Sequence, residues 1–237
     1  MFYITGDTHG DFQRLENFAY QKKLSQDKDT IIVLGDVGIN FSRGEQNSKD
    51  KLTKKFLSYS DYSLFCIKGN HEQYPDKIKG YKEKIWHGGK VFYEEEFPSL
   101  IFAQDGEIYD INGFKCLVIG GAYSVDKPYR VANGWMWFDD EQPSEKTKKY
   151  VEKQLKDNDW KVDFILSHTC PYDERPTHLF SPYIDQSLVD TSTEQWMQKI
   201  ANKTDFKRWY YGHYHGEYES GKFKLMYYGI EKFPEKQ

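Results

Sequence analysis

Metal-binding side chains that directly follow predicted strands are the feature that most constrains how this chain can fold. The first group lies in residues 6–10, Gly-Asp-Thr-His-Gly, immediately after the apolar run 2–4. Residues two apart in a strand point to the same face, so Asp7 and His9 can bind one metal ion together. The flanking glycines allow ligands and backbone to approach that ion closely. An aspartate before a helix is also a common N-cap or turn residue, so this pentapeptide alone is a weak signal.

Four further predicted strands end in the same way, at 30–34, 63–67, 162–166 and 207–211. Ligands of open α/β sheets bind at the carboxyl ends of strands. Five of the seven histidines lie in these turns, a distribution that histidines placed only by packing would rarely produce. The polar residues at the five strand ends are Asp7, His9, Asp36, Asn70, His71, His168, His213 and His215.

The order of the other predicted elements indicates an α/β chain. Helical spacing of apolar residues covers 11–23 and 45–59, between the first three strands. From 86 to 119 the chain changes to short strands, with Asn112-Gly113 as a hairpin turn, and we expect a second, mainly antiparallel sheet there. Helices over 144–158 and 193–201 and a hairpin over 218–228 follow. No repeat or linker interrupts the sequence, so we expect a single domain over residues 1–237.

Composition excludes several classes of protein. The net charge of −4 disfavours a protein that binds long nucleic acid, because such binding depends on neutralising phosphates. No apolar run approaches the roughly 20 residues of a membrane span. The first strand begins almost at Met1, with no signal peptide before it, and the three cysteines form no Cys-x-x-Cys pair. We therefore expect a cytoplasmic protein without disulfides or a membrane partner; the oligomeric state stays open.

The ordered set Asp-x-His, Gly-Asp, Gly-Asn-His, a later His and Gly-His-x-His runs from residue 6 to residue 215. This set resembles the calcineurin-like metallophosphoesterase superfamily. The resemblance implies an α/β (α+β) fold, a four-layer αββα sandwich of two mixed β-sheets flanked by helices. It also implies a dinuclear metal site at the strand ends and hydrolysis of a phosphate ester.

The resemblance further implies a role for each matching residue. The first ion would be bound by Asp7, His9 and His215. The second would be bound by Asn70, His168 and His213, with Asp36 bridging both ions. His71 would protonate the leaving group as general acid; the alternative is a histidine held structurally in its turn. Mixed carboxylate, amide and imidazole ligands suit transition metals, so we expect two divalent ions, manganese first, with Fe, Zn, Co or Ni as alternatives.

In this interpretation a hydroxide bridging the two ions attacks phosphorus in line. Phosphoprotein phosphatases of the superfamily carry an acid and an arginine directly after Gly-Asp, whereas residues 37–40 here are Val-Gly-Ile-Asn. This difference disfavours a protein-phosphatase type of site and leaves open which residue orients His71.

Arginine suits bidentate phosphate binding, so Arg130 is the first candidate for contact with the substrate; the alternative is that Arg130 forms a structural ion pair. Further candidates are Arg43, Tyr123 and Asp126.

The expected activity is that of a phosphomonoesterase or of a phosphodiesterase acting on a small molecule or nucleotide. We expect the loops over 123–138 and 171–190 to shape that choice. An inactive binding or scaffold protein with the same fold is one alternative, disfavoured because no ligand of the pattern is missing. A nuclease is another, disfavoured by the acidic balance of the chain.

Overall fold

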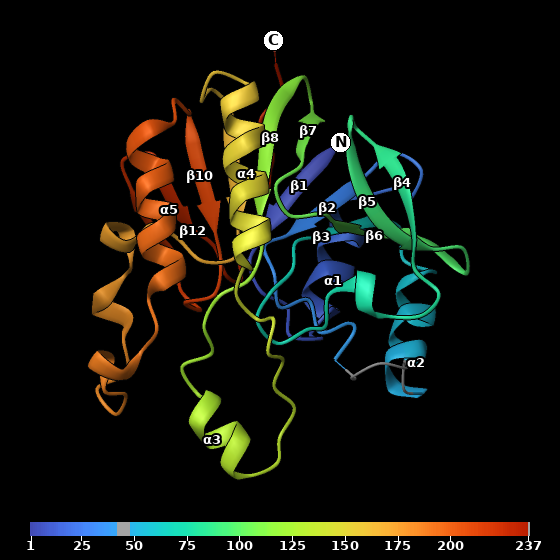
Figure 1. Cartoon of the computed structure of the whole chain (residues 1–237). Helices are drawn as coiled ribbons and strands as arrows, with labels where there is room; N and C mark the ends of the chain where they lie inside the picture. The colour runs from blue at the N-terminus through green and yellow to red at the C-terminus, as the bar shows by residue number, and fades with distance from the viewer. Residues whose placement is uncertain (42–47, 237) are drawn as a thin grey trace.

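Two mixed β-sheets form the centre of the molecule (Figure 1). The computed structural model describes residues 1–41 and 48–236. Across the first sheet the strands run in the order β13 (Ile230–Lys232), β1 (Phe2–Thr5), β2 (Thr30–Val33), β3 (Ser63–Cys66), β6 (Phe97–Ala103), β5 (Gly89–Glu94) and β4 (Lys82–Trp86). The second sheet has the order β11 (Tyr218–Ser220), β12 (Phe223–Leu225), β10 (Arg208–Tyr211), β9 (Phe164–Ser167), β8 (Phe114–Ile119) and β7 (Ile108–Ile111).

Helices cover the outer face of each sheet. Apolar residues of α1 (Gln13–Lys22) and α2 (Ser48–Leu57) pack in one cluster with β2 and β3. Those of α4 (Glu145–Asp157) and α5 (Ser192–Lys203) pack in another with β8 and β9. The layers are therefore helix, sheet, sheet, helix, as the resemblance implies. The short helix α3 (Lys127–Ala132) lies apart from both sheets at the lower edge of Figure 1. No helix of the described residues is both long and apolar enough to cross a membrane.

The apolar runs of the sequence arise because the central strands are buried on both faces. In β9, Phe164 and Leu166 face the cluster between the sheets, while Ile165 faces α4 and α5. In β1, Ile4 belongs to the inner cluster and Tyr3 to the cluster on the helix side. Strands covered on both faces read as continuous hydrophobic segments rather than as alternating ones.

Parallel pairing brings the functional loops to one edge. Strands β1, β2, β3 and β6 are mutually parallel neighbours in the first sheet. Strands β8, β9, β10 and β12 are parallel neighbours in the second. The carboxyl ends of parallel strands meet at the same edge, so the loops after β1, β2, β3, β9 and β10 can converge on one site.

The expectation of a separate second sheet over 86–119 is partly wrong. Strands β4, β5 and β6 extend the first sheet, and only β7 and β8 join the second. The reason is that β6 pairs in parallel with β3, with Leu100 opposite Leu64. A hairpin signal determines local pairing and does not determine which sheet the hairpin joins. Helix α3 and strands β4 and β13 were not predicted from the sequence. The predicted start of α4 after Ser144 is confirmed, because Ser144 Oγ accepts a hydrogen bond from Thr147 N at 3.1 Å.

The described residues also form four short 3-10 helical turns of three residues each: η1 (Pro75–Lys77), η2 (Tyr172–Glu174), η3 (Thr177–Leu179) and η4 (Gln186–Leu188). The last three lie in the loop between β9 and α5. This loop therefore has local order of its own and can form part of a defined cavity wall.

We predict that Leu166→Ala lowers the free energy of unfolding by about 2–5 kcal/mol, because Leu166 is fully buried between the sheets. Urea unfolding followed by circular dichroism measures this change. Leu52→Ala is the matched control, since Leu52 is 66% exposed and its substitution should cost less than about 0.5 kcal/mol. Equal losses for the two variants would contradict the assignment of the inter-sheet core.

Candidate metal centre

Eight polar side chains from five strand ends are brought together by the fold. They follow β1, β2 and β3 of the first sheet and β9 and β10 of the second. Polar contacts of 4.0 Å or less and one contact between imidazole rings connect all of them into one cluster. The members of the cluster are Asp7, His9, Asp36, Asn70, His71, His168, His213 and His215.

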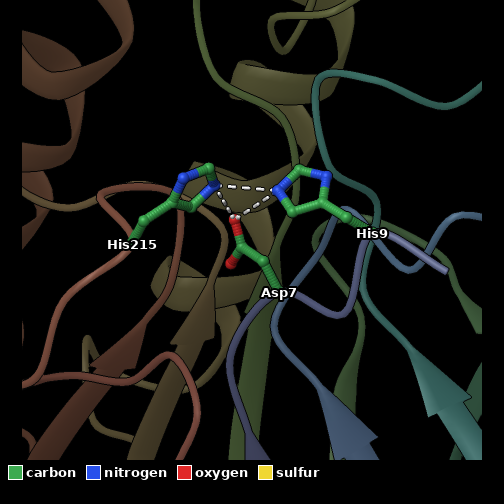
Figure 2. Close-up of side chains that lie close together, drawn as sticks. All are labelled: Asp7, His9 and His215. Carbon is green, nitrogen blue, oxygen red and sulfur yellow. Dashed lines mark hydrogen bonds and ion pairs between the residues drawn. The ribbon is translucent and has the colours of Figure 1, made fainter. Parts of the chain in front are cut away.

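Asp7, His9 and His215 form the first group of candidate ligands (Figure 2). Asp7 Oδ2 lies 3.3 Å from His215 Nε2 and 3.7 Å from His9 Nε2. The two imidazole nitrogens are 2.8 Å apart. Asp7 Oδ1 accepts a hydrogen bond from His213 N at 2.9 Å, but Oδ2 is buried and has no hydrogen-bond partner among the described residues. A buried carboxylate oxygen without a donor, facing two imidazole nitrogens, fits a divalent cation.

His168 belongs to the second group of candidate ligands, which also contains Asn70 and His213. Its Nε2 lies 2.8 Å from Asn70 Oδ1, and its Nδ1 lies 2.7 Å from the carbonyl oxygen of Leu34. A proton on Nδ1, donated to that carbonyl, leaves the Nε2 lone pair directed into the site, as is common for metal-binding histidines. The ring of His213 lies 5.0 Å from the ring of His168, centroid to centroid. Carboxylate oxygens of Asp7 and Asp36 also lie within 4.8 Å of a His168 ring nitrogen and of one another, whereas His213 approaches this group only through its ring.

Asp36 lies between the two groups. Its Oδ2 is 3.6 Å from His168 Nε2 and 3.9 Å from His9 Nε2. Its Oδ1 accepts a hydrogen bond from His71 N at 2.9 Å, which fixes the orientation of the carboxylate. A carboxylate held between two ligand groups has the position that a bridging ligand requires.

The electrostatics of the site favour positive charge. Burial opposes a charge on His168, yet the Asp36 and Asp7 carboxylates raise the pKa of this imidazole to about 9. Burial likewise opposes ionisation of Asp36, but the neighbouring His168, with His71 and His9, holds the pKa of this carboxyl below its ordinary value. Two buried carboxylates therefore stabilise any cation placed between them.

Glycines permit the close approach of ligands from different loops. A Cβ at Gly35 would lie 2.1 Å from His168 Nδ1, and a Cβ at Gly212 would lie 2.2 Å from Asp7 Oδ1. Any side chain at either position would displace a candidate ligand. The sequence analysis gave this reason for Gly6 and Gly10 instead, but there a Cβ would meet the carbonyl oxygen of Met226 or nothing within 4 Å.

Four of the candidate ligands adopt a left-handed backbone conformation, which non-glycine residues rarely take. Such strain concentrates at functional sites, where surrounding structure holds it in place. The φ angles are 47° for His9, 46° for Asp36, 70° for His213 and 49° for His215.

Glu72 supports the site and was missed by the sequence analysis, although it directly follows the Gly-Asn-His motif. Its Oε1 accepts hydrogen bonds from Val37 N at 3.1 Å and from Gly69 N at 3.0 Å. The side chain is fully enclosed, and burial, aided by the charge of Asp36, raises the pKa of Glu72 to about 8. Glu72 therefore ties the loop after β2 to the loop after β3.

His71 lies at the edge of the cluster. Its Nε2 is 4.0 Å from Asp36 Oδ2 and 3.2 Å from Asn70 Nδ2. Burial lowers the pKa of His71, while the charge of Asp36 raises it and that of Arg130 lowers it. The Asn70 amide nitrogen is a donor, so this contact is a hydrogen bond when His71 Nε2 carries no proton.

The expected substrate-contacting residues differ in their surroundings. Arg130 forms an ion pair within the protein, which is the alternative to substrate contact. Its Nε lies 2.7 Å from Asp126 Oδ2, and its Nη1 donates a hydrogen bond to the carbonyl of Met136. Tyr123 and Asp126 line a cavity beside the metal ligands. Arg43 lies outside the described residues.

That cavity has a volume of about 490 Å³. Its walls include Asp36, Asn70 and His71, and both predicted loops contribute, through residues 123–126 and 175–189. The sequence analysis did not single out several further lining residues, since three lie outside the motifs and Tyr214 is the unspecified position of Gly-His-x-His. They are Arg175, Phe180, Glu194 and Tyr214.

Comparison with known proteins shows the family to which this chain belongs. The sequence model of the calcineurin-like phosphoesterases matches residues 1–217. The chain therefore belongs to the calcineurin-like phosphoesterase family, hydrolases that act on phosphoric esters and typically depend on two metal ions. A search of curated proteins finds no significant match.

Two solved structures are similar to this chain. One is the phosphopantetheinyl hydrolase PptH from Mycobacterium tuberculosis, with 15% identity over 95% of this chain and 87% of that chain, and a TM-score of 0.46. The other is a protein serine/threonine phosphatase from Saccharomyces cerevisiae with similarity to human phosphatase PP5, with 16% identity over 95% of this chain and 66% of that chain, and a TM-score of 0.33.

We predict that Asp36→Asn strongly reduces metal binding, because it removes the carboxylate charge that lies between both ligand groups. Elemental analysis of purified protein should find about two transition-metal ions per chain in the wild type and fewer than one in the variant. Asp29→Asn is the control, since Asp29 is also buried but is bound to the N-terminal amine. Full metal content in Asp36→Asn would refute the bridging assignment.

Proposed function

We propose that this chain hydrolyses phosphate esters of small molecules or nucleotides with two divalent transition-metal ions, manganese first. The observation that carries the proposal is the buried Asp7 oxygen without a donor, at the centre of a cluster of carboxylate, amide and imidazole ligands. The cavity beside this cluster, of about 490 Å³, is far larger than a phosphate group and leaves room for the rest of an ester.

In this proposal each ligand group holds one ion. Asp7, His9 and His215 hold the first, and Asn70, His168 and His213 hold the second, with Asp36 shared. The bound ions supply Lewis acidity and a nucleophile from water at neutral pH. Asp7 and Asp36 offset only two of the four positive charges, so the site attracts phosphate despite the negative net charge of the chain.

His71 acts as the general acid in the same proposal. It borders the cavity, and its backbone N–H is tied to Asp36. A proton from its ring neutralises the oxygen of the leaving group as the ester bond breaks.

We predict that His71→Ala lowers kcat for phenyl phosphate by about 10²–10⁴-fold while leaving metal content intact. The loss should be much smaller for 2,4-dinitrophenyl phosphate, whose leaving group needs no proton. Steady-state kinetics on both esters, with elemental analysis of each preparation, measure these effects.

His87→Ala is the control for this experiment, because His87 lies in the turn after β4 and packs against Trp86, away from the cluster. Its kinetics should match those of the wild type. An equal loss on both esters in His71→Ala, or loss of metal, would show that His71 is not the general acid.

Monoesters and diesters both fit the proposed site. The relative kcat/KM for p-nitrophenyl phosphate and bis(p-nitrophenyl) phosphate assigns the class. Metal-loaded protein that hydrolyses no member of a broad phosphoester panel would identify the alternative, a binding protein with the same fold. Salt-dependent DNA binding would identify a nuclease.

The proposal also includes a cytoplasmic location and a single domain over residues 1–237.

A further inference from the structure

The cavity beside the metal centre extends well beyond the candidate ligands. Its outer wall comes from the loop between β9 and α5 and is largely apolar, with Leu179, Ile184 and Val189. The rings of Phe180 and Tyr214 stack there, with centroids 5.9 Å apart and planes 19° apart. A leaving group that fills this part of the cavity therefore has an apolar body.

Arg175 interrupts this apolar wall with a positive charge. Its guanidinium carbon lies 3.6 Å from the centroid of the Tyr172 ring, and its Nε donates to the Tyr172 carbonyl at 2.9 Å. These two contacts fix the plane of the guanidinium. Its two Nη atoms form no hydrogen bond or ion pair with the described residues, so a preoriented pair of donors is left for a ligand.

The other arginines of the described ranges are engaged within the protein. Arg14 donates to Thr5 Oγ1 and to backbone carbonyls. Arg130 pairs with Asp126, and Arg208 pairs with Glu219 at 2.7 Å. A guanidinium that lacks such a partner and lies in a cavity wall is suited to a carboxylate or a phosphate.

Arg175 lines the same cavity as the candidate ligands Asp36, Asn70 and His71. It also lines a neighbouring cavity, formed by residues between Tyr172 and Thr191, which contains none of the candidate metal ligands. A ligand that reaches Arg175 from the metal centre therefore crosses the apolar wall.

Glu194 is the acidic residue in the same wall. Its Oε1 accepts a hydrogen bond from Thr169 Oγ1 at 2.8 Å, and it forms no ion pair with Arg175. Burial raises the pKa of Glu194, whereas the charge of Arg175 lowers it. The Nη donors of Arg175 are thus not occupied by this carboxyl group.

We propose that Arg175 binds a second anionic group, a phosphate or a carboxylate, carried by the leaving group of the substrate. The scissile phosphate lies at the metal centre, and the apolar wall packs against the spacer between the two anions. This inference rests on the proposed function and narrows its substrates to phosphoesters with an apolar spacer and a distal anion.

Binding measured by calorimetry on manganese-loaded protein tests the inference independently of turnover. The probes are benzylphosphonate, 4-carboxybenzylphosphonate, its longer biphenyl analogue and a xylylene bisphosphonate, none of which can be hydrolysed. We expect at least one probe with a second anion to bind about tenfold or more tightly than benzylphosphonate. Comparing the carboxylate probes with the bisphosphonate distinguishes the two anions.

Arg175→Gln should abolish this preference and leave the affinity for benzylphosphonate within about twofold. Arg175→Lys should retain part of it, because lysine keeps the charge and loses the planar fork. Arg208→Gln is the matched control and should keep the full preference, since Arg208 pairs with Glu219.

Equal affinity for all four probes, or a preference that survives in Arg175→Gln, would overturn the inference. Hydrolysis of phenyl phosphate by the same preparation separates this failure from that of the proposed function. An active enzyme without the preference contradicts only the role of Arg175. An inactive protein that shows the preference, and loses it in Arg175→Gln, supports the anion site and contradicts only hydrolysis.

Discussion

The burial of two carboxylates, Asp7 and Asp36, at the edge where the sheets meet is the constraint on which the rest of the site depends. A buried carboxylate is costly unless positive charge or donors surround it. Each of these two has one oxygen bonded to a backbone N–H and the other directed toward imidazole nitrogens. Ligands from both sheets must therefore approach within a few ångströms, which requires glycine at positions such as 35 and 212 and left-handed backbone at four ligands.

Much of this arrangement could be predicted from the sequence. Strands buried on both faces leave apolar runs, and polar residues that follow several such runs must lie at one edge of a parallel sheet. The sheet to which a strand belongs was not predictable in the same way. The hairpin signal at Asn112-Gly113 specifies the pairing of β7 with β8, but the placement of β6 beside β3 depends on long-range packing. Glu72 and Arg175 were missed because their roles depend on contacts between separate loops.

The division of labour between scaffold and loops follows from these observations. Strand ends carry the candidate ligands and His71, and the two carboxylates among them, Asp7 and Asp36, are buried. The loop between β9 and α5 and the segment before α3 form the walls of the cavity. Substrate choice can therefore vary through Arg175, Phe180 and their neighbours without disturbing the metal centre. The family can therefore be recognised from the few residues at the strand ends, whereas the substrate depends on loop residues that no motif marks.

Anomalous diffraction at the manganese edge from crystals of manganese-loaded protein tests the central claim most directly. The account predicts two peaks about 3.5–4 Å apart. One should lie within bonding distance of Asp7, His9 and His215, and the other within bonding distance of Asn70, His168 and His213, with Asp36 between them. A single peak, or two peaks that Asp36 does not share, would contradict the account.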